Sequence, residues 1–233
     1  MKNDVKNINE EKYFEKIKLK HSLLFPSFFI LVIWLVELTE SSLNLDLRYL
    51  GIFPLKWSGL IGILTSPLIH SDFNHIFNNS TSMFILSIGL FYFYRPLSYK
   101  IFFIIYFTSG VLVWLMARPA YHIGCSGVIY GLASFLFFSG IIRNDIRLMA
   151  ISLIVIFLYG SMIWGIFPLD HSISWESHLW GGFSGMFLSI IYRNHGPRRP
   201  RYSWETEEEY DEEDDVSEDT IKGREWKDEN IND

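Results

Sequence analysis

The sequence predicts an all-α membrane protein whose six transmembrane helices form a bundle around an outward-facing polar cavity. Three observations predict this fold class. Long apolar segments recur along the chain, and basic residues are concentrated in alternate connections between them. The polar residues of the apolar region are clustered at the starts of the second, fourth and sixth segments.

Each predicted helix is an apolar segment close to the roughly 20 residues that cross the hydrocarbon core. The first, residues 22–38, follows a lysine-rich stretch that lacks the cleavage site of a signal peptide, so we expect a retained first helix. Five more spans are expected at residues 76–94, 101–116, 123–142, 148–167 and 175–192. The chain is thus divided into an N-terminal stretch (1–21), a six-helix domain (22–192) and a tail (193–233).

The distribution of lysine and arginine predicts the orientation, because these residues favour the cytoplasmic side. With the N-terminus inside, the inner segments hold 14 basic residues, whereas the outer loops hold Arg48, Lys56 and Arg118. Both termini are therefore expected in the cytoplasm. We expect a multi-pass protein of a bacterial cytoplasmic membrane.

Two connecting segments stand out, one by its length and one by its charge. The first outer loop, residues 39–74, is either a structured functional element or a simple amphipathic connector, and Trp57 favours contact with the membrane interface. Residues 203–233 hold 15 acids and 3 bases. We expect this tail to be disordered, with partner binding as the alternative.

Ser126 is the first candidate for chemistry, because it lies between glycines at the start of the fourth segment. A serine hydroxyl becomes a strong nucleophile when a base removes its proton, and the resulting oxyanion needs hydrogen-bond donors. Gly124 and Gly127 leave room for a peptide and permit a tight entry into the helix. The same pattern is typical of helix packing in membranes, so the base and the donors must come from elsewhere. Cys125, the single cysteine, is expected to point away from the serine.

His178, at the start of the sixth segment, is the candidate general base. In the predicted topology the second, fourth and sixth helices all begin at the outer face, which places His178 and Ser126 at the same level. Glycine pairs that favour close helix packing occur in both helices, Gly127 with Gly131 and Gly181 with Gly185. Tyr130, one turn after the serine, could support the imidazole by stacking. The alternative is an interfacial histidine that caps its helix.

His75 and Asn79 are the candidate oxyanion donors, since they lie on one face of the second helix. Both side chains can donate a hydrogen bond, and the backbone N–H of Ser126 would complete the oxyanion hole. The alternative is that the polar cluster serves hydrogen bonding between helices. That interpretation is adopted for three neighbours, Asn78, Ser80 and Ser82.

Other chemistries lack the residues they need. A metal site from His70, His75 and His178 lacks the spacing of a zinc protease, and the last three spans contain no aspartate pair. Asp170 and Glu176 are not assigned as a third member of a triad. A transporter would need a charge within these spans. A serine–histidine dyad without metal or cofactor is the simplest interpretation.

Taken together, these motifs resemble those of the rhomboid intramembrane serine proteases in their basic six-helix bacterial form. The resemblance covers about residues 22–192. It is carried by three motifs, Gly124, Ser126 and Gly127 with Tyr130; His178 with Gly181 and Gly185; and His75 and Asn79 with the earlier His70. The tryptophan–arginine pair common in the first outer loop of this family is missing here, which leaves the details of that loop undefined.

The resemblance implies a Ser126–His178 dyad, an acyl-enzyme intermediate and an oxyanion hole from His75, Asn79 and the Ser126 backbone, with Gly124 and Tyr130 also at the site. It implies cleavage of single-pass membrane proteins near their outer end, in the lipid bilayer and without a nucleic-acid partner. It also implies a gate formed by the fifth helix and residues 168–174. The alternative is a non-catalytic relative that holds membrane clients, although such relatives usually lack the serine or the histidine.

A constraint on the substrate follows from the physics of a peptide bond inside a membrane helix. Such a bond is hydrogen-bonded and shielded, so the helix must unwind before Ser126 can attack. We therefore expect small or helix-destabilising residues such as glycine, alanine or serine around the cleaved bond.

Overall fold

The computed structural model describes residues 2–158, 164–169 and 173–197, and the regular elements in these ranges are helices. The longer ones are α1 (Lys2–Ser42), α3 (Phe73–Phe93), α4 (Ser98–Met116), α5 (Ser126–Arg143), α6 (Ile146–Leu158) and α7 (Trp175–Ile191). The short ones are η1 (Arg48–Leu50), η2 (Trp57–Leu60), α2 (Gly62–Thr65), η3 (Ser66–Leu68) and η4 (Trp164–Ile166). The all-helical prediction is confirmed for this part of the chain.

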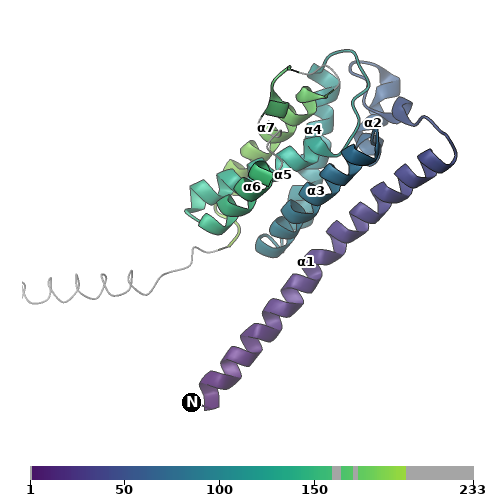
Figure 1. The fold of residues 1–233 in the computed structure, drawn as a ribbon. Coiled ribbons are helices and arrows are strands. Elements are labelled where there is room, and N and C mark those ends of the chain that lie inside the picture. Colours follow the sequence, from purple (N-terminus) through teal and green to yellow (C-terminus); the bar gives the residue numbers. More distant parts are fainter. Residues whose placement is uncertain (1, 159–163, 170–172, 198–233) are drawn as a thin grey trace, which may run out of the picture. The chain divides into compact units, whose positions relative to one another are not determined.

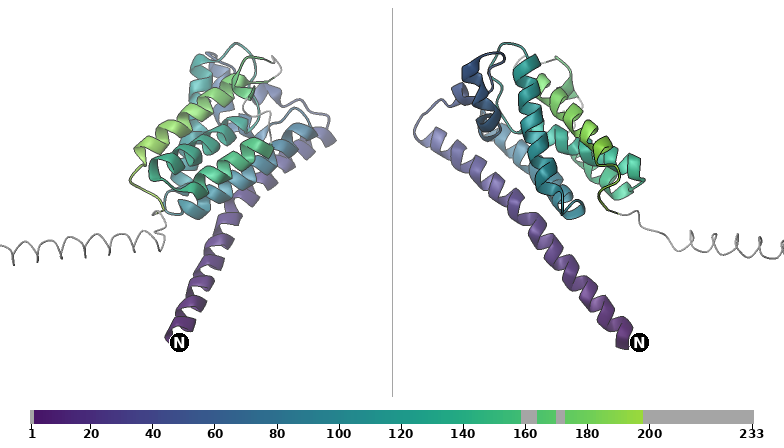
Figure 2. Two further views of the ribbon diagram at one scale, coloured as in Figure 1. Left: turned by 60° about the vertical axis from the view of Figure 1, so that its left-hand side comes forward. Right: turned by 180° about the vertical axis from the view of Figure 1, so that it is seen from behind.

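Helix α5 lies at the centre of the bundle, in contact with α3, α4, α6 and α7 (Figures 1 and 2). Twelve of its 18 residues are buried, beginning with Ser126. Apolar side chains such as Met83 of α3, Ile105 of α4 and Phe135 of α5 share one core with it. The first residue of α5 is therefore held inside the protein rather than on its surface.

Four helices in the described ranges are long and apolar enough to cross a membrane, namely residues 12–42 of α1 together with α3, α4 and α5. The outer faces of the bundle carry large apolar side chains, among them Leu31 and Leu35 on α1 and Phe183 and Phe187 on α7. Such faces are expected where helices meet lipid tails. The chain is therefore an integral membrane protein.

Several boundaries differ from the predicted ones. Helix α1 already begins at Lys2, because the lysines and glutamates before the apolar segment are themselves good helix formers. The prediction of one helix over 148–167 is wrong at its end, since the described part of α6 ends at Leu158 and residues 164–166 form a 3₁₀ turn. The acidic tail and part of the predicted gate, residues 170–172, lie outside the described residues.

The long loop between α1 and α3 is built from short helices that are hydrogen-bonded to α4. The indole N–H of Trp114 donates to the carbonyl oxygen of Lys56 at 3.0 Å. The hydroxyl of Tyr106 donates to the carbonyl oxygen of Leu64 at 2.5 Å. These contacts decide in favour of a structured loop over a simple connector. Trp57 projects from it with 84% of its surface exposed, as an interfacial side chain would.

Candidate active site

Ser126 and His178 lie in direct contact. The Nε2 atom of His178 is 2.8 Å from the Oγ atom of Ser126, and each residue is only 8% exposed. Ser126 is the first residue of α5, and His178 lies in the first turn of α7. Two helix ends thus bring together a hydroxyl and an imidazole that are 52 residues apart in the sequence.

The glycine pairs explain how α5 and α7 come close enough for this contact. A Cβ atom on Gly181 would lie 1.9 Å from the carbonyl oxygen of Gly127, and one on Gly185 would lie 1.9 Å from that of Gly131. No larger residue fits at either position without moving the helices apart. The prediction that these glycines permit close packing is confirmed.

Two groups hold the imidazole of His178 in place. Its Nδ1 atom is 2.8 Å from the carbonyl oxygen of Gly165, and the ring of Tyr130 stacks on it with a centroid distance of 4.2 Å and an interplanar angle of 10°. Because a carbonyl oxygen only accepts, Nδ1 carries the proton and Nε2 presents its lone pair to Ser126. The hydroxyl of Ser126 is therefore the donor in that contact.

Gly165 is a site residue that the sequence analysis missed. Any residue type presents a carbonyl, so its role as an acceptor leaves no mark in the sequence. The glycine itself carries a signal, since a Cβ atom there would lie 2.3 Å from the hydroxyl oxygen of Tyr130. Glu176 does not contact the base, because its carboxylate is paired with Arg118, with Nε and Oε1 3.5 Å apart. Asp170 lies outside the described residues.

Gly124, His75 and Asn79 meet beside the nucleophile. Gly124 has a φ of +97°, which a residue with a side chain rarely adopts, and this turn ends at the start of α5. A Cβ atom on Gly124 would lie 3.1 Å from Nε2 of His75 and 3.5 Å from Nδ2 of Asn79. Nδ2 is buried and has no hydrogen-bond partner among the described residues. The missing side chain thus leaves a space into which an unpaired donor points.

Hydrogen bonds at the start of α3 determine which ring nitrogen of His75 carries the proton. Asp72 caps the helix, accepting from the backbone N–H of His75 at 2.9 Å and from the Ser71 hydroxyl at 2.7 Å. These hydrogen bonds lower the pKa of the Asp72 carboxyl. Since Ser71 donates to Asp72, its oxygen accepts from Nδ1 of His75, 3.1 Å away. Nε2 of His75 therefore donates only when the ring carries both protons, a condition that the sequence analysis did not foresee.

Ser80 and His70 make structural contacts, whereas Asn78 and Ser82 line the same cavity as Ser126 and His178. Ser80 accepts a hydrogen bond from the indole of Trp34 at 3.0 Å, which links α3 to α1 as the helix-packing interpretation predicts. The buried ring of His70 lies edge-on to His75, and burial lowers its pKa to about 3. No group of three or more histidine, cysteine or acidic residues in the described ranges is arranged to hold a metal ion. Cys125, beside Ser126, is fully buried.

His122 is a second residue that the sequence analysis missed. Its Nδ1 atom is 2.5 Å from the Oγ atom of Ser174, and its Nε2 atom is 3.1 Å from the carbonyl oxygen of Arg118. Ser174 is the N-cap of α7 and accepts from the N–H of Ser177. Burial lowers the pKa of His122. The segment before Ser126 is thereby tied to the start of the helix that carries His178.

A cavity of about 650 Å³ opens over these groups. It is lined by Ser126, His178, His75, Asn79 and Tyr130, and by Arg48 and Arg118 further out. Small-molecule and peptide sites commonly have volumes of about 300–1,000 Å³. The arrangement joins an oriented base, a hydroxyl and an unpaired donor in a space that can admit a short extended peptide.

The structure thus combines a membrane-embedded bundle of apolar helices with a buried serine–histidine contact. Residues 58–195 match the family described as Rhomboid domain, which is well over half of the chain. The chain belongs to the rhomboid family, a family of intramembrane serine proteases.

Several relatives are similar over most of their length. The uncharacterized protein Rv1337 of Mycobacterium tuberculosis is 31% identical over 177 residues, which cover 70% of this chain and 72% of the relative. The uncharacterized protein ML1171 of Mycobacterium leprae is 30% identical over 70% of this chain and 68% of its own. The Bacillus subtilis protein named "Putative rhomboid protease YdcA" is 29% identical over 61% of this chain and 70% of its own.

Proposed function

We propose that this chain is an endopeptidase that cleaves single-pass membrane proteins in or beside their transmembrane segments, with Ser126 as nucleophile and His178 as general base. The observation that carries the proposal is the 2.8 Å contact between Nε2 of His178 and Oγ of Ser126, in a buried site beside an unpaired donor. Membership of the rhomboid family supports the same reaction class.

The first half of the reaction forms an acyl-enzyme. Oγ of Ser126 attacks the carbonyl carbon of the scissile peptide bond while Nε2 of His178 takes the hydroxyl proton. The carbonyl of Gly165 stays hydrogen-bonded to Nδ1–H and so faces the imidazolium that forms. The tetrahedral intermediate collapses when its C–N bond breaks, and His178 gives the proton to the departing amine.

The space beside Gly124 would hold the oxyanion of the tetrahedral intermediate. Asn79 donates from Nδ2 as a neutral amide, and the backbone N–H of Ser126 lies at the start of α5, where helix N–H groups are free. His75 adds a donor and a positive charge once its ring is doubly protonated. In the second half, water attacks the acyl carbon, His178 takes its proton, and the proton returns to Oγ as the C–O bond of the ester breaks.

The proposed topology places this chemistry at the outer face of the membrane. Six spans, α1 and α3 to α7, would cross it as one domain over about residues 22–192, with residues 1–21 and 193–233 in the cytoplasm. The excess of basic residues at the inner ends supports this orientation. The substrate helix must unwind at the cleaved bond, so small residues are expected there.

The experiment is cleavage of a model single-pass substrate by the detergent-purified full-length protein. Ser126→Ala and His178→Ala are each expected to lower the rate by a factor of about 10⁴ or more, because nucleophile and base act as a unit. Ser184→Ala is a matched control, since its hydroxyl donates to the carbonyl oxygen of Trp180 in the same helix. Mass spectrometry of the products locates the cleaved bond.

The alternative is a rhomboid-like protein that binds membrane clients without cutting them. It gains if folded wild-type protein binds several candidate substrates and cleaves none of them. It also gains if the two dyad variants cleave as fast as Ser184→Ala, because another protease would then be the source of the products.

A further inference from the structure

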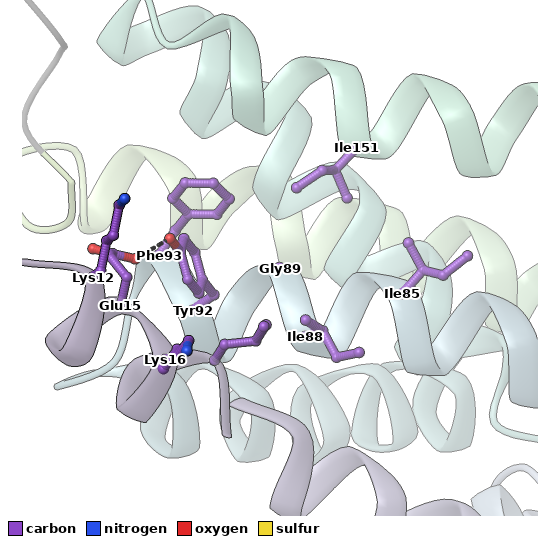
Figure 3. Close-up of a pocket in the computed structure, with 10 residues that line it drawn as sticks. Lys12, Glu15, Lys16, Ile85, Ile88, Gly89, Tyr92, Phe93 and Ile151 are labelled. Atoms are coloured by element: carbon purple, nitrogen blue, oxygen red, sulfur yellow. Dashed lines mark hydrogen bonds between the residues drawn. The ribbon is translucent and has the colours of Figure 1, made fainter. Parts of the chain in front are cut away.

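A second cavity lies at the end of α3 opposite to His75, between α3, α6 and the N-terminal part of α1. Its volume is about 860 Å³. Figure 3 shows its rim and floor, with Lys12, Glu15 and Lys16 on α1 and Ile85, Ile88 and Ile151 on α3 and α6. None of the residues that line it belongs to the candidate active site, so it needs its own explanation.

The rim of this groove carries a net positive charge. Lys12 and Lys16 are one helical turn apart on the same side of α1, and neither is paired with a carboxylate among the described residues. The rim also holds Glu15, but its carboxylate accepts from the Tyr92 hydroxyl and lies 3.5 Å from the ammonium of Lys18. Lys18 thereby balances Glu15, and the charges of Lys12 and Lys16 remain.

The floor of the groove is apolar. Ile85, Ile88, Gly89 and Ile151 form it, and α3 is one of the helices apolar enough to cross a membrane. Lys16 precedes the apolar segment of α1, which begins near residue 22, by about six residues or roughly 9 Å along the helix. The headgroup layer on each side of a bilayer is about 5–8 Å thick. In the proposed topology the rim would therefore lie near the phosphates and the floor beside the acyl chains.

We propose that this groove binds one anionic phospholipid, with its phosphate between Lys12 and Lys16 and an acyl chain along Ile85, Ile88 and Ile151. Basic pockets at the ends of membrane helices attract acidic headgroups, and an apolar floor favours the attached chain over a soluble anion. The lipid would fill the space between α1 and α6 and join the N-terminal part of α1 to the bundle.

The test is lipid retention by the full-length protein in native mass spectrometry, titrated with phosphatidylglycerol or phosphatidylcholine. One phosphatidylglycerol is expected to be retained at least tenfold more tightly than phosphatidylcholine. The pair Lys12→Gln and Lys16→Gln is expected to weaken its retention about 30-fold, as two headgroup contacts are lost. The control pair, Lys20→Gln and Lys100→Gln, removes the same charge outside the groove and is expected to change retention less than threefold.

A second variant tests the apolar floor without changing any charge. Ile88→Trp is expected to fill the groove and weaken phosphatidylglycerol retention tenfold or more, with unchanged thermal unfolding as the check on folding. Equal retention of both lipids, equal weakening by the two lysine pairs, or full retention by Ile88→Trp would each overturn the proposal. The proposal would also be overturned if glycerol 3-phosphate displaced phosphatidylglycerol as effectively as the lipid itself does. Displacement of the lipid by a bound transmembrane chain of another protein would overturn it as well.

Discussion

Replacing Gly181 by alanine puts one methyl group at the point where α5 and α7 are closest. The new Cβ atom would lie 1.9 Å from the carbonyl oxygen of Gly127, whereas real Cβ contacts stay beyond about 3 Å, so the helices must separate by about 1 Å. Overpacking of this kind costs about 1–3 kcal/mol. His178 lies one turn away on α7, and a displacement of about 1 Å at a reacting group lowers a rate by a factor of about 100.

Gly182→Ala is the matched control, because a Cβ atom at this neighbouring position has nothing within 4 Å. The same chemical change there should stabilise α7 by about 0.5–1 kcal/mol through helix propensity alone. The assays are thermal unfolding in detergent and cleavage of the model substrate. If Gly181→Ala and Gly182→Ala unfold at the same temperature and cleave equally fast, the argument that close packing of α5 and α7 positions the dyad is refuted.

Three further predictions concern groups around the dyad. Asn79→Ala is expected to lower kcat by a factor of about 100–1,000 with little change in KM. Asn74→Ala, exposed on the same helix and outside the lining of the active-site cavity, is expected to leave kinetics unchanged. Tyr130→Phe keeps the stacked ring and should retain most of the activity, whereas Tyr130→Leu is expected to lower kcat about tenfold. An equal decrease of kcat in both variants would assign the effect to the hydroxyl. Ser174→Ala removes the cap of α7 and should lower the free energy of unfolding by about 1 kcal/mol in thermal denaturation; an unchanged midpoint would contradict a capping role.

Much of the site could be predicted because polar side chains are costly in a membrane. Ser126, His178 and Asn79 stand out against apolar surroundings, and their positions at helix starts imply a shared face once the topology is known. The glycine spacing then predicts close contact between two particular helices. Stacking of Tyr130 on His178 follows from its place one turn after the serine.

The parts that could not be predicted depend on connections between helices. The contact of the Gly165 carbonyl with His178 and the contact of His122 with Ser174 depend on the conformation of loops. Loops have no periodic sequence pattern from which these contacts could be predicted. The sequence predicts one helix up to residue 167 because the apolar residues continue to that point, whereas residues 164–166 form a 3₁₀ turn. Hydropathy reports on burial and not on the local path of the chain.

The acceptor behind His178 is a main-chain carbonyl, and a carbonyl does not titrate. In a serine–histidine–aspartate triad the orienting acid can itself become protonated as the pH falls, which adds a second ionisation to the rate profile. The proposed dyad has no such group at Nδ1. Acidification therefore cannot protonate the acceptor that orients the imidazole. A side chain at Gly165 would leave the carbonyl in the chain, but its Cβ atom would lie 2.3 Å from the hydroxyl oxygen of Tyr130 and 2.9 Å from Nδ1 of His178. The element that aligns the base is therefore insensitive to pH, but it depends on a glycine, because any larger residue at position 165 must move the carbonyl or the stacked rings.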